Sequence, residues 1–143
     1  MAAGAAGDAM DLGQAVIVAG IGCRKGASAS EIGAAIDAAL SRAGLQPDAL
    51  GLLATPAMKG GEPGIAAAAT SLGVPLVLVP RADLEAAGVR TATRSERVVA
   101  LMGVPSVAEA AALAAGGPAA RLLAPRIAIG PATCALAQSG GAR

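Results

Sequence analysis

Residues 16–32, VIVAGIGCRKGASASEI, join a short apolar run to a glycine-rich loop and the start of a helix. The apolar run, residues 15–21, is continuous and β-branched, which is typical of a strand covered on both faces of its sheet. From Ser28 onward, apolar residues recur at every fourth position, which predicts a helix. Ser28 and Glu31 have the spacing of a capping box, and Gly44 stands where a helix often ends in glycine. This stretch therefore predicts a strand, a loop and a capped helix in direct succession.

The rest of the chain continues this alternation of strands and helices. The predicted elements are strands at 49–54 and 75–80, helices at 63–72, 81–88, 95–103 and 106–115, and two late strands within 121–138 that meet at a Gly130-Pro131 turn. Strands and helices that alternate with short links indicate βαβ crossovers. We therefore predict an α/β fold: one domain at 15–138, with three α/β/α layers, a mostly parallel sheet and a late hairpin-like strand pair. Disordered tails are expected at 1–14 and 139–143.

Composition excludes several function classes. The 143 residues contain no His, Phe, Tyr or Trp, so Ser-His-Asp triads, imidazole metal ligands and base stacking on aromatic rings are all excluded. The net charge is +1 and the cations are scattered, so no nucleic-acid partner is expected. The two cysteines, Cys23 and Cys134, form no CxxC motif, so no metal site is predicted and both thiols are expected to be reduced.

The sequence shows neither a signal peptide nor a membrane-spanning segment. Its first residues lack the basic and apolar regions of a signal peptide, and no apolar run has the length and flanks of a membrane span. We therefore expect a soluble, cytoplasmic protein with no membrane partner. Its many Ala and Gly residues fit either tight helix packing or a face for self-association, so a homo-oligomer is left open.

The loop after the first strand is a candidate anion site. In α/β proteins, ligands bind beyond the carboxyl ends of the strands, where the first amides of the next helix favour negative charge. Arg24 and Lys25 add two cations beside those amides. The candidate ligand-binding residues of this loop are Gly22, Cys23, Arg24, Lys25, Gly26 and Ser28. The alternative is that the two cations only solvate a surface turn.

Further candidates lie outside this loop. Lys59 and Glu62 fall beyond the next predicted strand and can flank the same crevice, although Glu62 can instead serve the N-terminus of the helix at 63. Ser95 and Thr133 complete the ligand-binding candidates. Ser95 can be an N-cap or a ligand hydroxyl. Thr133 can be a ligand hydroxyl or a β-branched residue that fills space in its strand. Glu109 has the position of a capping glutamate.

The sequence ranks no catalytic group. Cys23, Glu62 and Glu109 are the candidates for catalysis, but none of them forms a recognisable acid–base couple with another residue. A lone cysteine is more often a small buried side chain than a nucleophile. The loop also departs from the dinucleotide fingerprint by one residue, and Lys25 is followed by Gly26 where a Walker loop has Ser or Thr.

Four segments together resemble one family. They are VAGIGCRKGASASEI at 18–32, MKGGEPGI at 58–65, SERVVALMGVPSVAEAAAL at 95–113 and RIAIGPATCALA at 126–137. In this order and spacing they are similar to the family of cobalamin biosynthesis protein CobE and the C-terminal domain of CbiG. The resemblance implies a cytoplasmic role in corrin-ring construction, without a cofactor, and a precorrin or cobalt-precorrin as partner, alongside other enzymes of the pathway.

The resemblance leaves three functions open. The first is a carrier that binds the tetrapyrrole through its carboxylates and hands it on, and the second is a hydrolase that opens a (cobalt-)precorrin lactone. A third function, a nucleotide-binding module, rests on the glycine loop alone. For the carrier, Arg24, Lys25 and Lys59 are expected to hold the carboxylates, while the ring rests on aliphatic surface such as Ile21, Met58 or Leu84.

Overall fold

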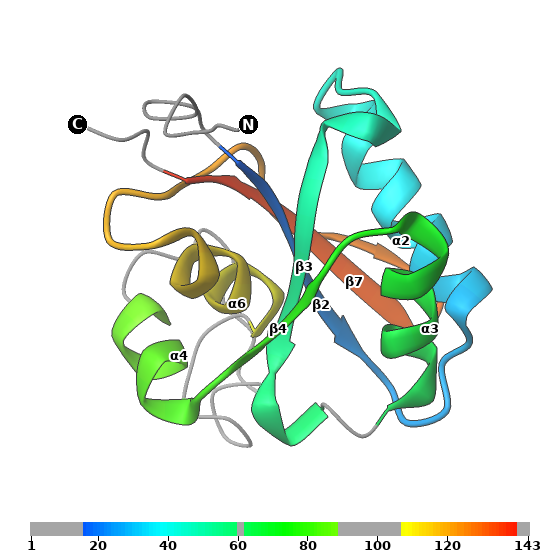
Figure 1. The fold of residues 1–143 in the computed structure, drawn as a ribbon, viewed down its shortest axis with the longest axis horizontal. Coiled ribbons are helices and arrows are strands. Elements are labelled where there is room, and N and C mark those ends of the chain that lie inside the picture. Colours follow the sequence, from blue (N-terminus) through cyan, green and yellow to red (C-terminus); the bar gives the residue numbers. More distant parts are fainter. Residues whose placement is uncertain (1–15, 60–61, 89–106, 140–143) are drawn as a thin grey trace.

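The computed structural model describes residues 16–59, 62–88 and 107–139. Strands and helices alternate along the chain (Figure 1). In order they are β2 (Ile17–Cys23), α2 (Ala29–Arg42), the 3₁₀ turn η1 (Pro47–Ala49), β3 (Leu50–Pro56), the 3₁₀ turn η2 (Ala57–Lys59), α3 (Pro63–Leu72), β4 (Leu76–Val79), α4 (Arg81–Gly88), α6 (Val107–Gly116), β5 (Arg121–Leu122), β6 (Ile127–Ile129) and β7 (Ala132–Gln138).

The strands form one sheet in which five follow the order β4-β3-β2-β7-β5, while β6 also pairs with β7. The first three are parallel to one another, and β7 runs antiparallel to β2, β5 and β6. A turn at Gly130-Pro131 connects β6 to β7, which confirms the late hairpin. The parallel part of the sheet is thus β4-β3-β2, and the α/β class is confirmed.

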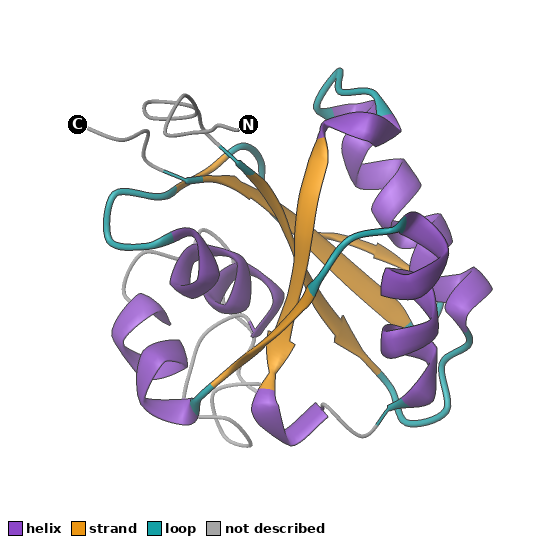
Figure 2. Cartoon of the chain, in the orientation of Figure 1, coloured by secondary structure: helices purple, strands orange, loops and turns teal. Residues whose placement is uncertain are grey.

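Helices cover both faces of the sheet, so the three predicted layers are confirmed (Figures 1 and 2). On one face, α2 and α3 enclose a core that includes Ile21, Ile36 and Ile65. On the other face, α4 and α6 enclose a core that includes Leu84 and Leu113 with many alanines. Small side chains let these helices approach the sheet closely.

The predicted helix after the glycine loop is present with both of its ends. Ser28 Oγ accepts the Glu31 N–H at 3.0 Å, and Glu31 Oε1 accepts the Ser28 N–H at 2.9 Å, which completes the capping box. At the other end Gly44 has φ +74°, and the Leu45 N–H donates to the Leu40 carbonyl at 2.8 Å. This is a Schellman ending, which requires a left-handed residue after the helix.

Helix α6 packs directly on the backbone of β2. A Cβ at Gly20 would overlap the carbonyl oxygen of Ala108 and lie 2.7 Å from the amide nitrogen of Ala112. Only glycine leaves room for this contact. At Gly20, therefore, the backbone of α6 packs directly against the sheet.

Two details differ from the sequence-based expectation, and some elements fall outside the described ranges. Residues 121–138 form three strands rather than two, because the chain leaves the sheet after Leu123 and Pro125 has no N–H to pair. The loop expected to start at Thr55 begins later, since β3 continues to Pro56. The predicted helix at 95–103 and tail at 1–14 lie outside the described residues, as does nearly all of the tail at 139–143. Among the described helices, none is long and apolar enough to span a bilayer.

Candidate functional site

The carboxyl ends of the three parallel strands lie along one edge of the sheet (Figure 2). Residues 24–28 follow β2, η2 follows β3, and α4 follows β4. The backbone of Lys59, at the end of η2, therefore lies on the same edge as Arg24, as the crevice hypothesis requires. The Lys59 side chain and all of Ser95 lie outside the described part of the chain. We refer to this rim of the sheet as the carboxyl edge.

The loop after β2 has a defined conformation. The Arg24 N–H donates to the Pro131 carbonyl at 2.9 Å, which ties the loop to the β6–β7 turn. The Ala27 N–H donates to the Arg24 carbonyl at 3.1 Å and closes a β-turn with Gly26 at its third position. Gly26 has φ +83°, which a type II turn requires there. The turn leaves the side chains of Arg24 and Lys25 exposed to solvent.

Glu62 joins the two polar segments of the edge, and it is also the N-cap residue of α3. Its side chain makes no capping hydrogen bond to that helix. Instead, Glu62 Oε1 accepts the Gly26 N–H at 3.0 Å across 36 positions of sequence. Behind this bond, a Cβ at Gly64 would overlap the carbonyl oxygen of Ala27, so the start of α3 packs on the loop backbone to backbone.

Two threonine hydroxyls complete the end of β2. Thr133 Oγ1 donates to the Gly22 carbonyl at 3.2 Å, so its hydroxyl serves the sheet. Thr55 is fully buried and donates to the Ile21 carbonyl at 2.9 Å, just beyond the last residue that pairs β2 with β3. Thr55 was not among the predicted site residues, because its partner lies 34 positions away in the sequence.

Two other predicted residues also have structural partners. The Ser28 hydroxyl accepts the Glu31 N–H within the capping box. Glu109 is fully buried in α6 and its Oε2 accepts the Arg126 N–H at 2.9 Å, ahead of β6. Ser106 lies three residues before Glu109, at the spacing of a capping box, but it is outside the described residues. Because the Glu109 carboxylate is closed to solvent, it is poorly placed to meet a ligand.

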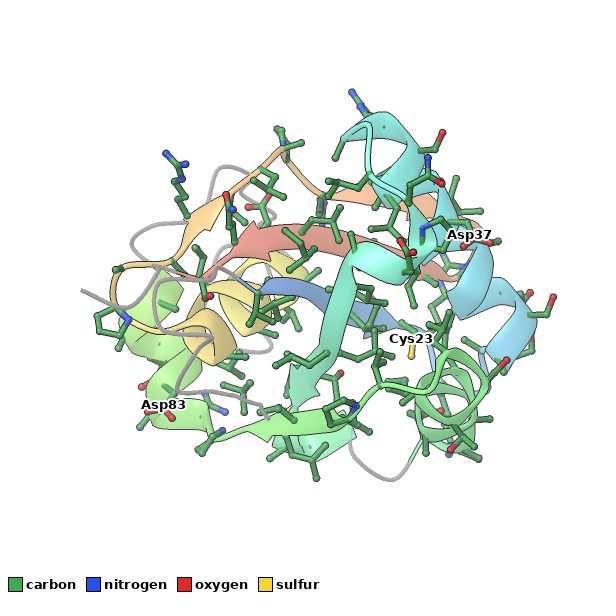
Figure 3. All side chains as sticks on the ribbon, turned by 45° about the horizontal axis from the view of Figure 1, so that its top comes forward. Cys23, Asp37 and Asp83 are labelled. Carbon is green, nitrogen blue, oxygen red and sulfur yellow. The ribbon has the colours of Figure 1, made fainter. Side chains whose placement is uncertain are left out.

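The two cysteines occupy different environments. Cys23 is half-buried at the end of β2, and its sulfur points toward α3 (Figure 3). Cys134 is fully buried in the core, and desolvation raises the pKa of its thiol from 9.0 to about 12. A thiol reacts as the thiolate, so Cys134 is unreactive at neutral pH.

We therefore expect one thiol of the native protein to react readily with Ellman's reagent at mildly alkaline pH. That thiol is Cys23, and a Cys23→Ser variant should lose the fast phase. In denaturant both cysteines of the wild type should react. Stability should also fall as the pH rises above the ordinary thiol pKa of about 8.5, because only the unfolded Cys134 ionises there. Two fast thiols in the native state would contradict this assignment.

Three exposed apolar side chains are spread along the carboxyl edge, on both sides of β2. Met58, Leu78 and Ile129 are 54%, 46% and 37% exposed, and with Val16 they are the large apolar residues that stand out among those described. Leu78 lies beside Thr55 in the β3–β4 register, and Ile129 lies opposite Ala132, which in turn pairs with Cys23.

The expected aliphatic surface is thus partly different from the prediction. Met58 is confirmed as exposed, but Ile21 and Leu84 are wrong because they are 0% and 2% exposed, one in each core. Leu78 and Ile129 take their place. Both lie in apolar runs without clear alternation, so sequence periodicity could not tell which side chains reach solvent.

Charge distinguishes the carboxyl edge from two grooves that lie between pairs of helices. Arg24 and Lys25 form no ion pair with any described residue, whereas Arg81, which follows β4 on the same edge, pairs with Glu85 at 3.1 Å. The α2–α3 groove, of about 440 Å³, and the α4–α6 groove, of about 430 Å³, each contain an aspartate, Asp37 and Asp83 respectively (Figure 3). An acidic ligand therefore fits the carboxyl edge better than either groove.

Within the described ranges, no cluster of three or more Cys, Asp or Glu could hold a metal ion.

Comparisons with known proteins agree with one another. Residues 17–137 match the family model described as "Cobalamin synthesis G C-terminus". Protein CobE from Sinorhizobium sp. is 41% identical over 121 residues, which cover 85% of this chain and 79% of that protein. The crystal structure of CobE, described as a protein from the cobalamin biosynthetic pathway, has a TM-score of 0.84 at 34% identity, covering 91% of this chain and 94% of the other. Cobalamin biosynthesis protein chiG from Agrobacterium tumefaciens has a TM-score of 0.69 at 47% identity, covering 85% and 97%.

Proposed function

The chain is a cobalamin biosynthesis protein of the CobE and CbiG C-terminal family, and on this premise we propose that it binds a precorrin or cobalt-precorrin intermediate at its carboxyl edge and hands it on. The intermediate is a broad apolar ring whose rim carries acetate and propionate groups. The receiving partners are other enzymes of corrin-ring construction, and the exchange takes place in the cytoplasm.

The observation that carries the proposal is the meeting of cations and exposed apolar side chains on one edge. Arg24 and Lys25 offer charge-assisted hydrogen bonds to carboxylates. Met58, Leu78 and Ile129 offer apolar contact on the same edge. Exposed apolar side chains beside cations suit a ligand that is itself both apolar and acidic. An amphiphilic ring with an acidic rim matches this combination better than a nucleotide, which would need an aromatic or aliphatic slot beside a phosphate loop.

A carrier fits the site better than a hydrolase. Ester or lactone hydrolysis needs a positioned base or nucleophile within hydrogen-bond reach of a partner. Of the three catalytic candidates, Glu62 is bonded to a backbone amide and Glu109 is buried against another. Cys23 is half-buried in a chain without histidine. Glu62 and Glu109 are thus engaged by the backbone, and a chain without histidine lacks the usual base that activates a cysteine nucleophile.

A titration with tetrapyrroles tests the proposal. The protein has no Trp or Tyr, so the bands of an added precorrin, cobalt-precorrin or uroporphyrin can be read without interference. We expect a stoichiometric spectral shift at micromolar protein, with the ligand mass unchanged after long incubation. A change in ligand mass with time would instead indicate the lactone hydrolase. No spectral shift together with thermal stabilisation by ATP or NADPH would replace the proposal with nucleotide binding.

A further inference from the structure

Glu62 places a carboxylate of the protein itself inside the loop that the ligand is proposed to use. Its Oε1 accepts the Gly26 N–H at 3.0 Å, one residue after Lys25, in a turn whose two cations form no ion pair with any described residue. The carboxylate thus occupies one of the donors that this turn directs to solvent. We propose that Glu62 is an internal competitor that a ligand carboxylate must displace from Gly26, and that it thereby sets the specificity of the edge for ligands with several carboxylates.

The position of Glu62 is fixed by the packing of the α3 backbone on the loop after β2. The start of α3 packs against Ala27 so closely that Gly64 cannot carry a Cβ. The loop itself is held by Pro131 on one side and by the capping box on the other. The Glu62 side chain also makes no capping hydrogen bond to its own helix, so its carboxylate has no competing role there. The bond to Gly26 is therefore a built feature of the free protein.

A competing carboxylate distinguishes ligands by the number of carboxylates that they carry. A ligand with a single carboxylate gains one contact at Gly26 only by releasing another carboxylate of equal charge, so its net gain is small. A ligand with carboxylates around a ring can engage Arg24 and Lys25 first and displace Glu62 with the advantage of high effective concentration. The edge would then reject abundant small acids and accept a polycarboxylate tetrapyrrole. This inference rests on the proposed function for the identity of the ligand.

Three variants test the role of Glu62. Glu62→Ala frees the Gly26 N–H, and Glu62→Gln keeps an acceptor but removes the charge. Glu31→Gln is the matched control, because it removes the same charge close to the same loop while glutamine can still complete the capping box. With uroporphyrin as the probe, we expect Glu62→Ala to bind about 3- to 10-fold more tightly than the wild type, the factor expected for one charge at a solvent-exposed contact. Glu62→Gln should lie between them, and Glu31→Gln should gain less than Glu62→Gln.

The Gly26 amide provides a second measurement that needs no tetrapyrrole. In ¹⁵N-labelled protein, the Gly26 amide proton should move upfield in Glu62→Ala, and citrate should move it back at a lower concentration than is needed to perturb the wild type. Equal citrate responses, or uroporphyrin affinity that is unchanged or weaker in Glu62→Ala, would overturn the inference. A gain in Glu31→Gln as large as in Glu62→Gln would also overturn it. If no variant binds uroporphyrin, the proposed function fails, and the citrate response alone decides whether Glu62 is a competitor.

Discussion

Replacing Gly20 by alanine is expected to destabilise the fold by about 2–3 kcal/mol, because the added methyl group meets backbone rather than a side chain. Its Cβ would overlap the carbonyl oxygen of Ala108 and lie within 2.9 Å of the Ala112 Cβ. Neither group can rotate away, so α6 must move off the sheet. That movement would loosen the core that α6 shares with Leu84 and Val18.

Gly33 in α2 offers a matched control. The same methyl group added there meets nothing within 4 Å, and alanine favours helix, so Gly33→Ala should stabilise the protein by about 0.4–1 kcal/mol. Urea unfolding followed by far-ultraviolet circular dichroism measures both changes, which is convenient in a chain without tryptophan. If the two variants unfold at the same urea concentration, the close packing of α6 on β2 is not a stabilising contact.

Local sequence signals predicted those elements whose ends depend on neighbouring residues. The capping box at Ser28 and the left-handed Gly44 define α2 without any long-range contact. Pro63 and Gly73 likewise bound α3 where the sequence placed it. The hairpin turn at Gly130-Pro131 is another short-range signal. Each of these signals acts within about five residues, which is why a single sequence carries it.

The contacts that make the carboxyl edge act over longer distances. Glu62 was expected to serve its own helix, but it bonds Gly26, because the packing of Gly64 on Ala27 brings the two segments together. The exposure of Leu78 depends on its place in an edge strand, which a continuous apolar run does not reveal. Sequence spacing therefore predicted which loops meet but not which atoms bind each other.

The double variant Arg24→Ala/Lys25→Ala should bind uroporphyrin or a precorrin about 10- to 100-fold more weakly than the wild type. Each cation makes a charge-assisted hydrogen bond to a ligand carboxylate in the proposed complex. Such bonds contribute about 1.5–3 kcal/mol each at sheltered sites and about 1 kcal/mol each where, as here, the side chains are exposed. Binding by the wild type should also weaken as salt is added, and the slope should be shallower in the double variant. The visible absorption of the ligand, titrated at several salt concentrations, measures both effects.

A control at the opposite edge separates local contact from overall charge. Arg121 is exposed in β5 and lies opposite Gln138 in the strand register, at the same end of the sheet as the start of β2. Arg42 is exposed at the C-terminal end of α2. Arg42→Ala/Arg121→Ala lowers the net charge of +1 by the same two units, but it leaves the carboxyl edge intact. If only the Arg24/Lys25 pair lowers affinity, the ligand carboxylates lie at the loop after β2. If both double variants lose the same affinity, binding depends on net charge alone. The loop after β2 is then not the binding site.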